Sequence, residues 1–260
     1  MIKTLGLQLY TIRDFMKDEA AIDESFGRMV KLGYTEAQTA GCEIAPEKFG
    51  ELAKKHGINI VGTHYPWDAI RNDFDETVRV HRLWDTTNIG IGGMPRDARE
   101  SYDSLMKFIE EFNRLAALYA KEGFKLTYHN HSFEYVKIHD GKTIMDLLTE
   151  NLDDKNTSFV LDTCWVAHGG GDVRHWLEKL AGRVDILHLK DLVPYHNEKG
   201  ELVHTPTEIG AGNLWWDGII ETAQKIGVKS YTVEQDFYFA TGDAFDSIKQ
   251  SRDYLAKYMA

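Results

Sequence analysis

Extended and helical segments alternate eight times along this chain, which restricts the fold more than any other feature. Short apolar segments with a period near two each precede a longer segment with a period near 3.6. The short segments lie at 5–10, 34–38, 58–64, 88–93, 125–130, 158–162, 184–190 and 230–235. The helical segments lie at 20–33, 46–57, 75–86, 100–123, 141–152, 172–182, 214–227 and 242–259. Eight β-then-α units in 260 residues predict the α/β class and a single-domain (β/α)8 TIM barrel spanning residues 1–260.

Glycines at the ends of the helical segments support this prediction, because a left-handed residue commonly ends a helix. They are Gly33, Gly57, Gly123, Gly182 and Gly227. An open doubly wound sheet is the alternative. It is disfavoured because no strand is followed by a GxGxxG or Walker phosphate loop, and GIGGMP at 90–95 lacks the required spacing.

The charge of the chain excludes some partners. With 41 acidic and 30 basic residues the net charge is −11, which argues against nucleic acid or an anionic membrane and favours a small polar substrate. No uncharged apolar run of about 18 residues and no leader-like N-terminus is present, so we expect a cytoplasmic protein. Cys42 and Cys164 form no CxxC pair, so we expect two buried thiols rather than a disulfide or a thiolate zinc site.

Polar residues at the carboxyl ends of the predicted strands are the functional candidates, because active sites of this fold lie there. A helix-capping or loop-bonding role is the alternative for each of them, and for those on the first two strands it is at least as strong as a functional role. The candidates are Gln8, Tyr10, Glu36, Gln38, His64, His129, His131, Glu134, Asp162, His188, Lys190, Glu234, Gln235 and Asp236.

Three of these candidates indicate a metal site. Asp162, His188 and Glu234 follow apolar runs at equivalent heights, so their side chains should converge. Carboxylates with one imidazole suit one divalent metal, Mn, Mg, Co or Zn. The segment YHNHSFEY at 128–135 can supply a fourth ligand. We favour Glu134, because two carboxylates would flank the substrate as proton acceptors, and His129 or His131 is the alternative.

Motifs along the whole chain resemble the xylose-isomerase-like TIM barrels, a superfamily of sugar isomerases and epimerases, inosose dehydratases and hydroxypyruvate isomerases. The specific signal is LDTCW, HLKD and VEQD in order and at barrel spacing, joined by GLQLYTIRDFM, GTHY, YHNHSFEY and IGAGNLWW. The resemblance implies one metal held by Glu134, Asp162, His188 and Glu234, and a homo-oligomer. This chain departs from the ketose epimerases of the group, which look like they place a glutamate on the fifth strand itself, because it has YHNH there. The resemblance to the inosose dehydratases, which have a histidine-rich motif on this strand, implies that the ligand comes from the following turn.

The same superfamily contains endonuclease IV, whose further zinc ligands this chain lacks. Trp165 replaces the histidine of the LDTCH pattern, and Pro206, two residues after His204, cannot bind metal. Endonuclease activity is therefore not expected.

The sequence thus predicts a metal-dependent isomerase or epimerase acting on a sugar or cyclitol. Glu134 or Glu234 would remove a proton and give a metal-stabilised enediolate. A dehydratase or lyase acting on an inosose or a 3-keto sugar or glycoside is the alternative, and a non-catalytic sugar-binding barrel is a minor one. We expect the long segment 191–213 to be a lid, an oligomer contact or an exposed loop. The expected substrate-binding residues are Gln8, His64, His129, His131, Trp165 and Lys190.

Overall fold

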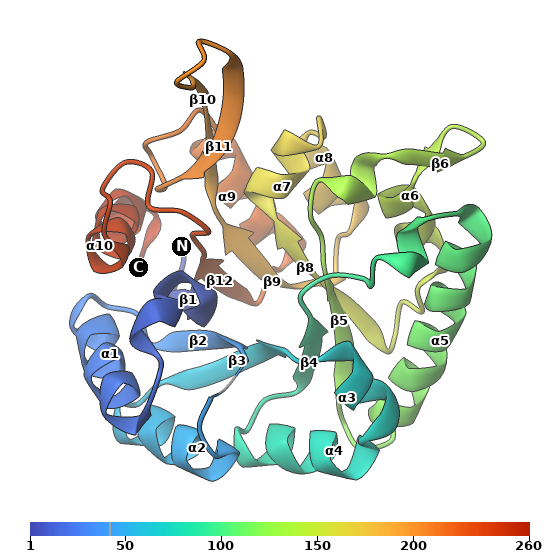
Figure 1. Ribbon diagram of the computed structural model, residues 1–260, viewed down its shortest axis with the longest axis horizontal. Helices are drawn as coiled ribbons and strands as arrows, with labels where there is room; N and C mark the ends of the chain where they lie inside the picture. The colour runs from blue at the N-terminus through green and yellow to red at the C-terminus, as the bar shows by residue number, and fades with distance from the viewer. Residues whose placement is uncertain (42) are drawn as a thin grey trace.

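Eight parallel strands form a nearly closed barrel in the computed structural model, which describes residues 1–41 and 43–260 (Figure 1). Their order around the ring is β3-β2-β1-β12-β9-β8-β5-β4, and every recorded pairing between them is parallel. The strands are β1 (Gly6–Gln8), β2 (Glu36–Ala40), β3 (Asn59–His64), β4 (Asn88–Ile91), β5 (Lys125–His129), β8 (Thr157–Asp162), β9 (Val184–Leu189) and β12 (Ser230–Val233). The predicted TIM barrel is confirmed.

The helices lie outside the ring of strands (Figure 1). They are α1 (Glu19–Lys31), α2 (Pro46–Lys55), α3 (Trp67–Asn72), α4 (Phe74–Leu83), α5 (Tyr102–Ala120), α6 (Ile144–Asn151), α7 (Thr163–His168), α8 (Val173–Lys179), α9 (Trp216–Ile226) and α10 (Ala244–Leu255). The five glycines expected at helix ends all have positive φ, between 68° and 91°, as predicted.

Strands β3 and β4 meet at the seam of the barrel. The Tyr65 N–H donates to the Gly90 carbonyl at 2.7 Å, and the Asn88 side-chain amide donates to the Val61 carbonyl at 2.9 Å. A Cβ at Gly90 would lie 2.1 Å from the Thr63 carbonyl oxygen, so only glycine permits this approach of the two strands.

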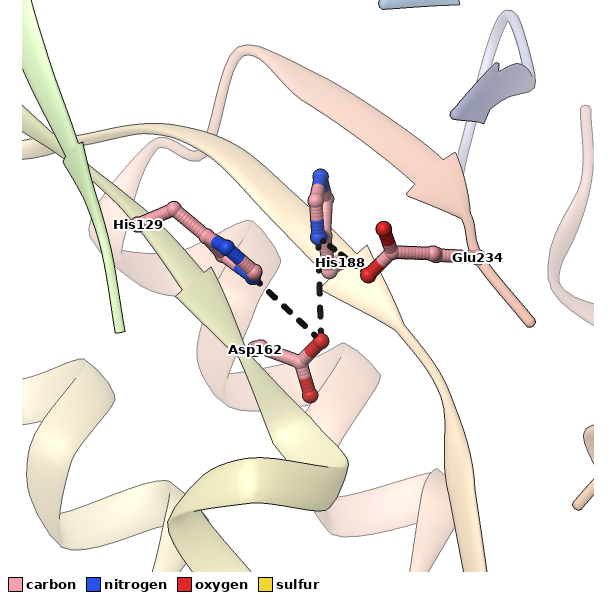
Figure 2. Close-up of side chains that lie close together, drawn as sticks. All are labelled: His129, Asp162, His188 and Glu234. Atoms are coloured by element: carbon pink, nitrogen blue, oxygen red, sulfur yellow. Dashed lines mark ion pairs between the residues drawn. The ribbon is translucent and has the colours of Figure 1, made fainter. Parts of the chain in front are cut away.

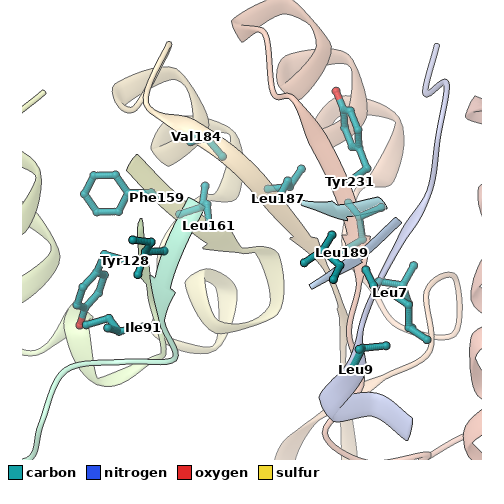
Figure 3. Packing of buried hydrophobic residues seen from close by; sticks show 14 of the residues in the cluster. Leu7, Leu9, Ile91, Tyr128, Phe159, Leu161, Val184, Leu187, Leu189 and Tyr231 are labelled. Atoms are coloured by element: carbon teal, nitrogen blue, oxygen red, sulfur yellow. The ribbon is translucent and has the colours of Figure 1, made fainter. Parts of the chain in front are cut away.

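The period of two in the strands separates a packing face from a site face. Leu187 and Leu189 of β9 are fully buried and belong to the apolar layer shown in Figure 3. His188 lies between them in sequence, so its side chain points to the opposite face, into the barrel. The same alternation places polar side chains from neighbouring strands inside the barrel mouth.

The structure adds elements that the alternation did not predict. Residues 191–207 form an antiparallel hairpin of β10 (Asp191–His196) and β11 (Leu202–Thr207), which projects from the barrel rim in Figure 1. The first strand is shorter than expected, because residues 9–15 form a 3-10 helix, η1 (Leu9–Phe15). Further short elements are η2 (Asp97–Arg99), η3 (Phe133–Tyr135), β6 (Lys137–His139), β7 (Lys142–Thr143) and η4 (Ala256–Tyr258).

Only one of the two cysteines lies among the described residues. Cys164 is buried and free, as expected, whereas Cys42 lies outside the described residues. In the part of the chain that the structure describes, no helix combines the length and apolar character needed to span a bilayer.

Candidate metal centre

Four buried side chains bring potential metal-binding atoms within 4.8 Å of one another: His129, Asp162, His188 and Glu234. Each lies within one residue of the carboxyl end of its strand, on β5, β8, β9 and β12. The strand register produces this convergence, since Asp162 is paired with His188. Within residues 1–41 and 43–260 no second group of this kind occurs.

The atoms that face each other in this group are those a cation would need (Figure 2). Asp162 Oδ2 lies 3.6 Å from His129 Nε2 and 3.7 Å from His188 Nδ1, and His188 Nδ1 lies 3.0 Å from Glu234 Oε2. None of these four atoms makes a hydrogen bond of acceptable geometry, although all are buried. Buried polar atoms are rarely left in this state, so the donor set fits a divalent cation.

The hydrogen bond made by His188 Nε2 determines which ring nitrogen presents a lone pair to the carboxylates. Its Nε2 lies 2.5 Å from the Gln38 Oε1, which can only accept a hydrogen bond. Nε2 therefore carries the proton, and Nδ1 presents a lone pair 3.0 Å from the Glu234 carboxylate. Two lone pairs at that distance require a proton or a metal ion between them.

His129 has the same arrangement at the opposite side of the group. Its Nδ1 is 3.4 Å from the Gly92 carbonyl oxygen, so Nδ1–H is the donor and Nε2 faces Asp162. An imidazole that donates its outer N–H to a carbonyl is the usual form of a metal-binding histidine.

The two carboxylate oxygens of Asp162 have different roles, one in capping a helix and one in the four-residue group. Oδ1 accepts a hydrogen bond from the Trp165 N–H at 2.9 Å and thereby caps α7. Its own N–H donates to the Asn130 side chain, which fixes the end of β8 against that of β5. The cap holds Oδ2 toward the two histidines, so the capping and functional interpretations of this residue both apply.

Lys190 adds a buried ammonium to the group. Its Nζ lies 2.9 Å from Asp162 Oδ2, 2.7 Å from Glu234 Oε2 and 2.8 Å from Asp236 Oδ2, and only the last contact has hydrogen-bond geometry. Burial alone would lower the pKa of Lys190, but these carboxylates outweigh it and hold the pKa well above its ordinary value.

The carboxylates respond to the same ammonium. Burial alone would raise the pKa values of Asp162 and Glu234, but Lys190, with histidine contacts, holds both well below their ordinary range. Both groups are therefore ionised at neutral pH. Burial instead raises the pKa of Asp236, with the Glu234 charge adding to the effect.

Glu134, the ligand that the sequence favoured, is not brought into this group. It is fully buried, Tyr128 Oη donates to its Oε1 at 2.7 Å, and the His131 N–H donates to its Oε2 at 2.8 Å. Burial raises its pKa to about 8. Both oxygens thus stabilise the turn after β5, and His129 occupies the place expected for Glu134.

The other predicted substrate-binding residues surround the four-residue group. The His64 ring stacks on the His129 ring at 4.9 Å, and the His131 ring lies 4.7 Å from it. Trp165 lies 5.8 Å from the His131 ring, with Lys190 Nζ 5.1 Å from the indole. The rings of His64 and His131 thus lie against the His129 ring, and Trp165 lies beside both His131 and Lys190.

Gln8 is a buried residue in contact with the His64 ring. Its amide nitrogen donates to Gln38 Oε1 at 3.0 Å and contacts His64 Nδ1 at 3.2 Å, while its Oε1 accepts from the Tyr10 N–H. With Nδ1 accepting, His64 carries its proton on Nε2, a buried atom without a partner. Gln8 therefore orients His64, and its own polar atoms are already hydrogen-bonded.

The sequence prediction gave no metal-binding, catalytic or substrate-binding role to several residues that support the site. Gln38 and Asp236 were both among the strand-end candidates. Glu234 and Asp236 are two residues apart in an extended segment, and this spacing indicates that their side chains share a face. Asn130 and Tyr128 carried no comparable signal, because their partners lie on another strand or beyond a turn.

Comparisons with known proteins agree with this fold and with a carbohydrate-related family. The family model described as xylose isomerase-like TIM barrel matches residues 26–258. An inosose dehydratase from Geobacillus thermodenitrificans (strain NG80-2) is 33% identical over 98 residues, which are 38% of this chain and 31% of that protein. The match thus spans about a third of that relative's length.

Solved structures resemble the chain over nearly its whole length. A sugar phosphate isomerase/epimerase from Parabacteroides distasonis ATCC 8503 has a TM-score of 0.79 at 22% identity, covering 98% of this chain and 94% of that one. A D-allulose 3-epimerase from Methylomonas sp. has a TM-score of 0.69 at 12% identity, covering 98% of both. At these identities the likeness concerns the fold. Together with the match of the family model, it shows that the chain belongs to the xylose isomerase-like TIM barrel family.

Proposed function

We propose that this protein is a divalent-metal-dependent carbohydrate enzyme, and specifically a lyase that eliminates water or an alcohol from a keto-sugar, keto-glycoside or inosose. One observation carries the choice of reaction. The isomerase or epimerase hypothesis used Glu134 and Glu234 as a pair of carboxylate bases, but both oxygens of Glu134 are hydrogen-bonded away from the group. Of the two proposed bases only Glu234 therefore remains in the group, beside the ligand carboxylate of Asp162, the imidazoles and the Lys190 ammonium.

The proposed ligands are His129, Asp162, His188 and Glu234. Two lone-pair nitrogens and two ionised carboxylates suit a cation of the Mn, Mg, Co or Zn type. When bound, this cation would act as a Lewis acid toward a substrate carbonyl.

Glu234 is the proposed base in this reaction. It would take the proton from the carbon beside the carbonyl, and a carbon–carbon double bond would form as the neighbouring carbon–oxygen bond breaks. The departing oxygen would take that proton from Glu234 and leave as water or an alcohol. Lys190 Nζ, 2.7 Å from Glu234 Oε2, would donate a hydrogen bond to the departing oxygen.

The remaining side chains would bind substrate. His64 presents a buried Nε2–H without a partner, suited to a hydroxyl or carbonyl oxygen. Trp165 and His131 offer ring faces against which a sugar can pack. The name of the inosose dehydratase that this chain partly matches supports the elimination chemistry.

Isomerisation or epimerisation is the second candidate, and His131 favours it. Its Nδ1 is buried and makes no hydrogen bond, and burial lowers the pKa of the ring to about 3, so the imidazole is neutral. It lies beside His129, whereas Figure 2 places Glu234 on the other side of His188 from His129. A neutral imidazole there could exchange a proton with the second face of a substrate.

The products distinguish the two reactions. The Mn-loaded protein is incubated in D2O with an inosose, a 3-keto-glycoside and a ketohexose, and the products are analysed by NMR and mass spectrometry. Loss of water or alcohol with formation of an enone is expected. A product of unchanged composition that carries deuterium at the carbon beside the carbonyl would instead indicate isomerisation or epimerisation. The Glu234→Gln variant should be inactive, with the exposed hairpin variant Glu198→Gln as its matched control.

A further inference from the structure

Lys190 and the proposed metal would share carboxylate oxygens. The ammonium lies within 2.9 Å of Asp162 Oδ2 and Glu234 Oε2, the two oxygens that also face the histidine nitrogens. An ammonium has three N–H bonds, and its third carboxylate neighbour is Asp236. A second cation at this position repels a bound metal unless another negative charge compensates it.

The charges of the buried cluster balance only when all members are counted. Asp162, Glu234 and Asp236 supply three negative charges, while Lys190 and a divalent cation supply three positive ones. The histidines are neutral as ligands. Lys190 is fully buried, and the Asp236 side chain is 22% exposed, so bulk water screens these charges weakly.

We propose that Lys190 and Asp236 form a charge-balancing pair that sets the affinity of the centre for divalent metal, with Lys190 as a tethered competing cation and Asp236 as its counter-charge. This inference rests on the proposed metal-dependent function and deepens it. It gives Asp236 a role that the four-ligand set does not include. It also makes the loaded centre neutral, which suits an uncharged sugar rather than an anionic one.

Removing the charge of Lys190 and removing the charge of Asp236 should change the affinity for metal in opposite directions. Lys190→Met removes the competing positive charge with little change in side-chain length, so Mn2+ should bind at least tenfold more tightly. Asp236→Asn keeps the shape and removes the counter-charge, so Mn2+ should bind at least tenfold more weakly. The double variant restores the balance and should bind within a few fold of the wild-type protein.

The measurement is calorimetric titration of the chelator-treated full chain with Mn2+, without substrate. Lys229→Met is the matched control, because it changes the net charge equally while its ion pair with Asp185 lies at the amino-terminal end of β12. Thermal unfolding of each variant verifies that it is folded. Lys190→Arg, which keeps the positive charge, should leave the affinity near the wild-type value.

The outcomes separate this inference from the proposed function. If the wild-type protein binds Mn2+ but Lys190→Met binds it less tightly, or if the double variant is not restored, Lys190 only holds the side chains in place and the charge-balancing role is refuted. If the wild-type protein binds no divalent metal, the proposed function itself fails, and with it this inference.

Discussion

Gln38 Oε1 accepts a hydrogen bond from His188 Nε2 at 2.5 Å, and this contact leaves Nδ1 of the same ring as the lone-pair atom facing Glu234. Gln38 also accepts from the Gln8 amide at 3.0 Å, so its carbonyl oxygen is fixed by two donors. Strand register creates the pair, because Gln8 and Gln38 are direct partners on β1 and β2. The first two strands, which supply no ligand, thus orient a ligand on β9.

Replacing Gln38 by Leu should weaken metal binding by 10- to 100-fold, the usual cost of losing the outer partner of a ligating histidine. The Leu side chain cannot accept a hydrogen bond from His188 Nε2, so the ring is free to change tautomer or rotate. Mn2+ titration measures the effect. Gln38→Glu retains an acceptor oxygen and should bind more tightly than Gln38→Leu. Equal affinity in the Leu variant and the wild-type protein would show that Gln38 does not orient His188.

Glu134 should make the free energy of unfolding depend on pH. Its pKa is about 8 in the folded protein against an ordinary value of 4.5, so between these values the folded state binds more protons than the unfolded state. Stability from this group is present at pH 4.5 and is lost as the pH rises to 8, at up to about 1.4 kcal/mol per pH unit.

The variant Glu134→Gln tests this dependence, because glutamine reproduces the donor and acceptor of the protonated acid. Urea unfolding at pH 5 and pH 8 should show the wild-type protein losing more stability than the variant, by a few kcal/mol on the order expected for a shift of this size. Parallel profiles for the two proteins would mean that Glu134 is ionised in the folded state throughout this range.

Asp191 should be among the most important polar residues for stability. Its carboxylate accepts hydrogen bonds from the N–H groups of Leu192, Gly210, Gly212 and Leu214 and from Trp216 Nε1. This set joins the β10–β11 hairpin to the start of α9. Asp191→Ala should lower the free energy of unfolding by about 3 kcal/mol or more, because several buried donors lose their acceptor. Chemical denaturation, with the exposed turn residue variant Asp154→Ala as the control, measures this loss.

The sequence predicted the barrel because its two periodicities are local properties of the chain. Each strand alternates apolar and polar residues, so Leu187, His188 and Leu189 already indicate which side chain points inward. The same logic predicted that Asp162, His188 and Glu234 converge, which the structure bears out in their distances. The hairpin at 191–207 showed no alternation of apolar and polar residues from which its strands could be predicted. Both strands contain several polar residues and a proline, and the turn between them is exposed.

The fourth member of the group depended on contacts that a linear pattern does not contain. His129 and Glu134 both follow the apolar part of β5, and either could face the mouth on the evidence of spacing. Tyr128 decides between them, because its hydroxyl and the His131 N–H satisfy both carboxylate oxygens of Glu134. A tyrosine on the outward face of a strand gives no sequence indication that it will hold a carboxylate six residues later.

The most direct test of the account is the metal stoichiometry and affinity of His129→Ala and Glu134→Gln, measured by Mn2+ calorimetry and elemental analysis after chelator treatment. One Mn2+ per chain is expected in the wild-type protein, with nearly unchanged affinity in Glu134→Gln and a loss of at least tenfold in His129→Ala. Loss of binding in Glu134→Gln with retention in His129→Ala would contradict this expectation, because Glu134 would then be the ligand and the arrangement around Tyr128 would not persist in the loaded protein.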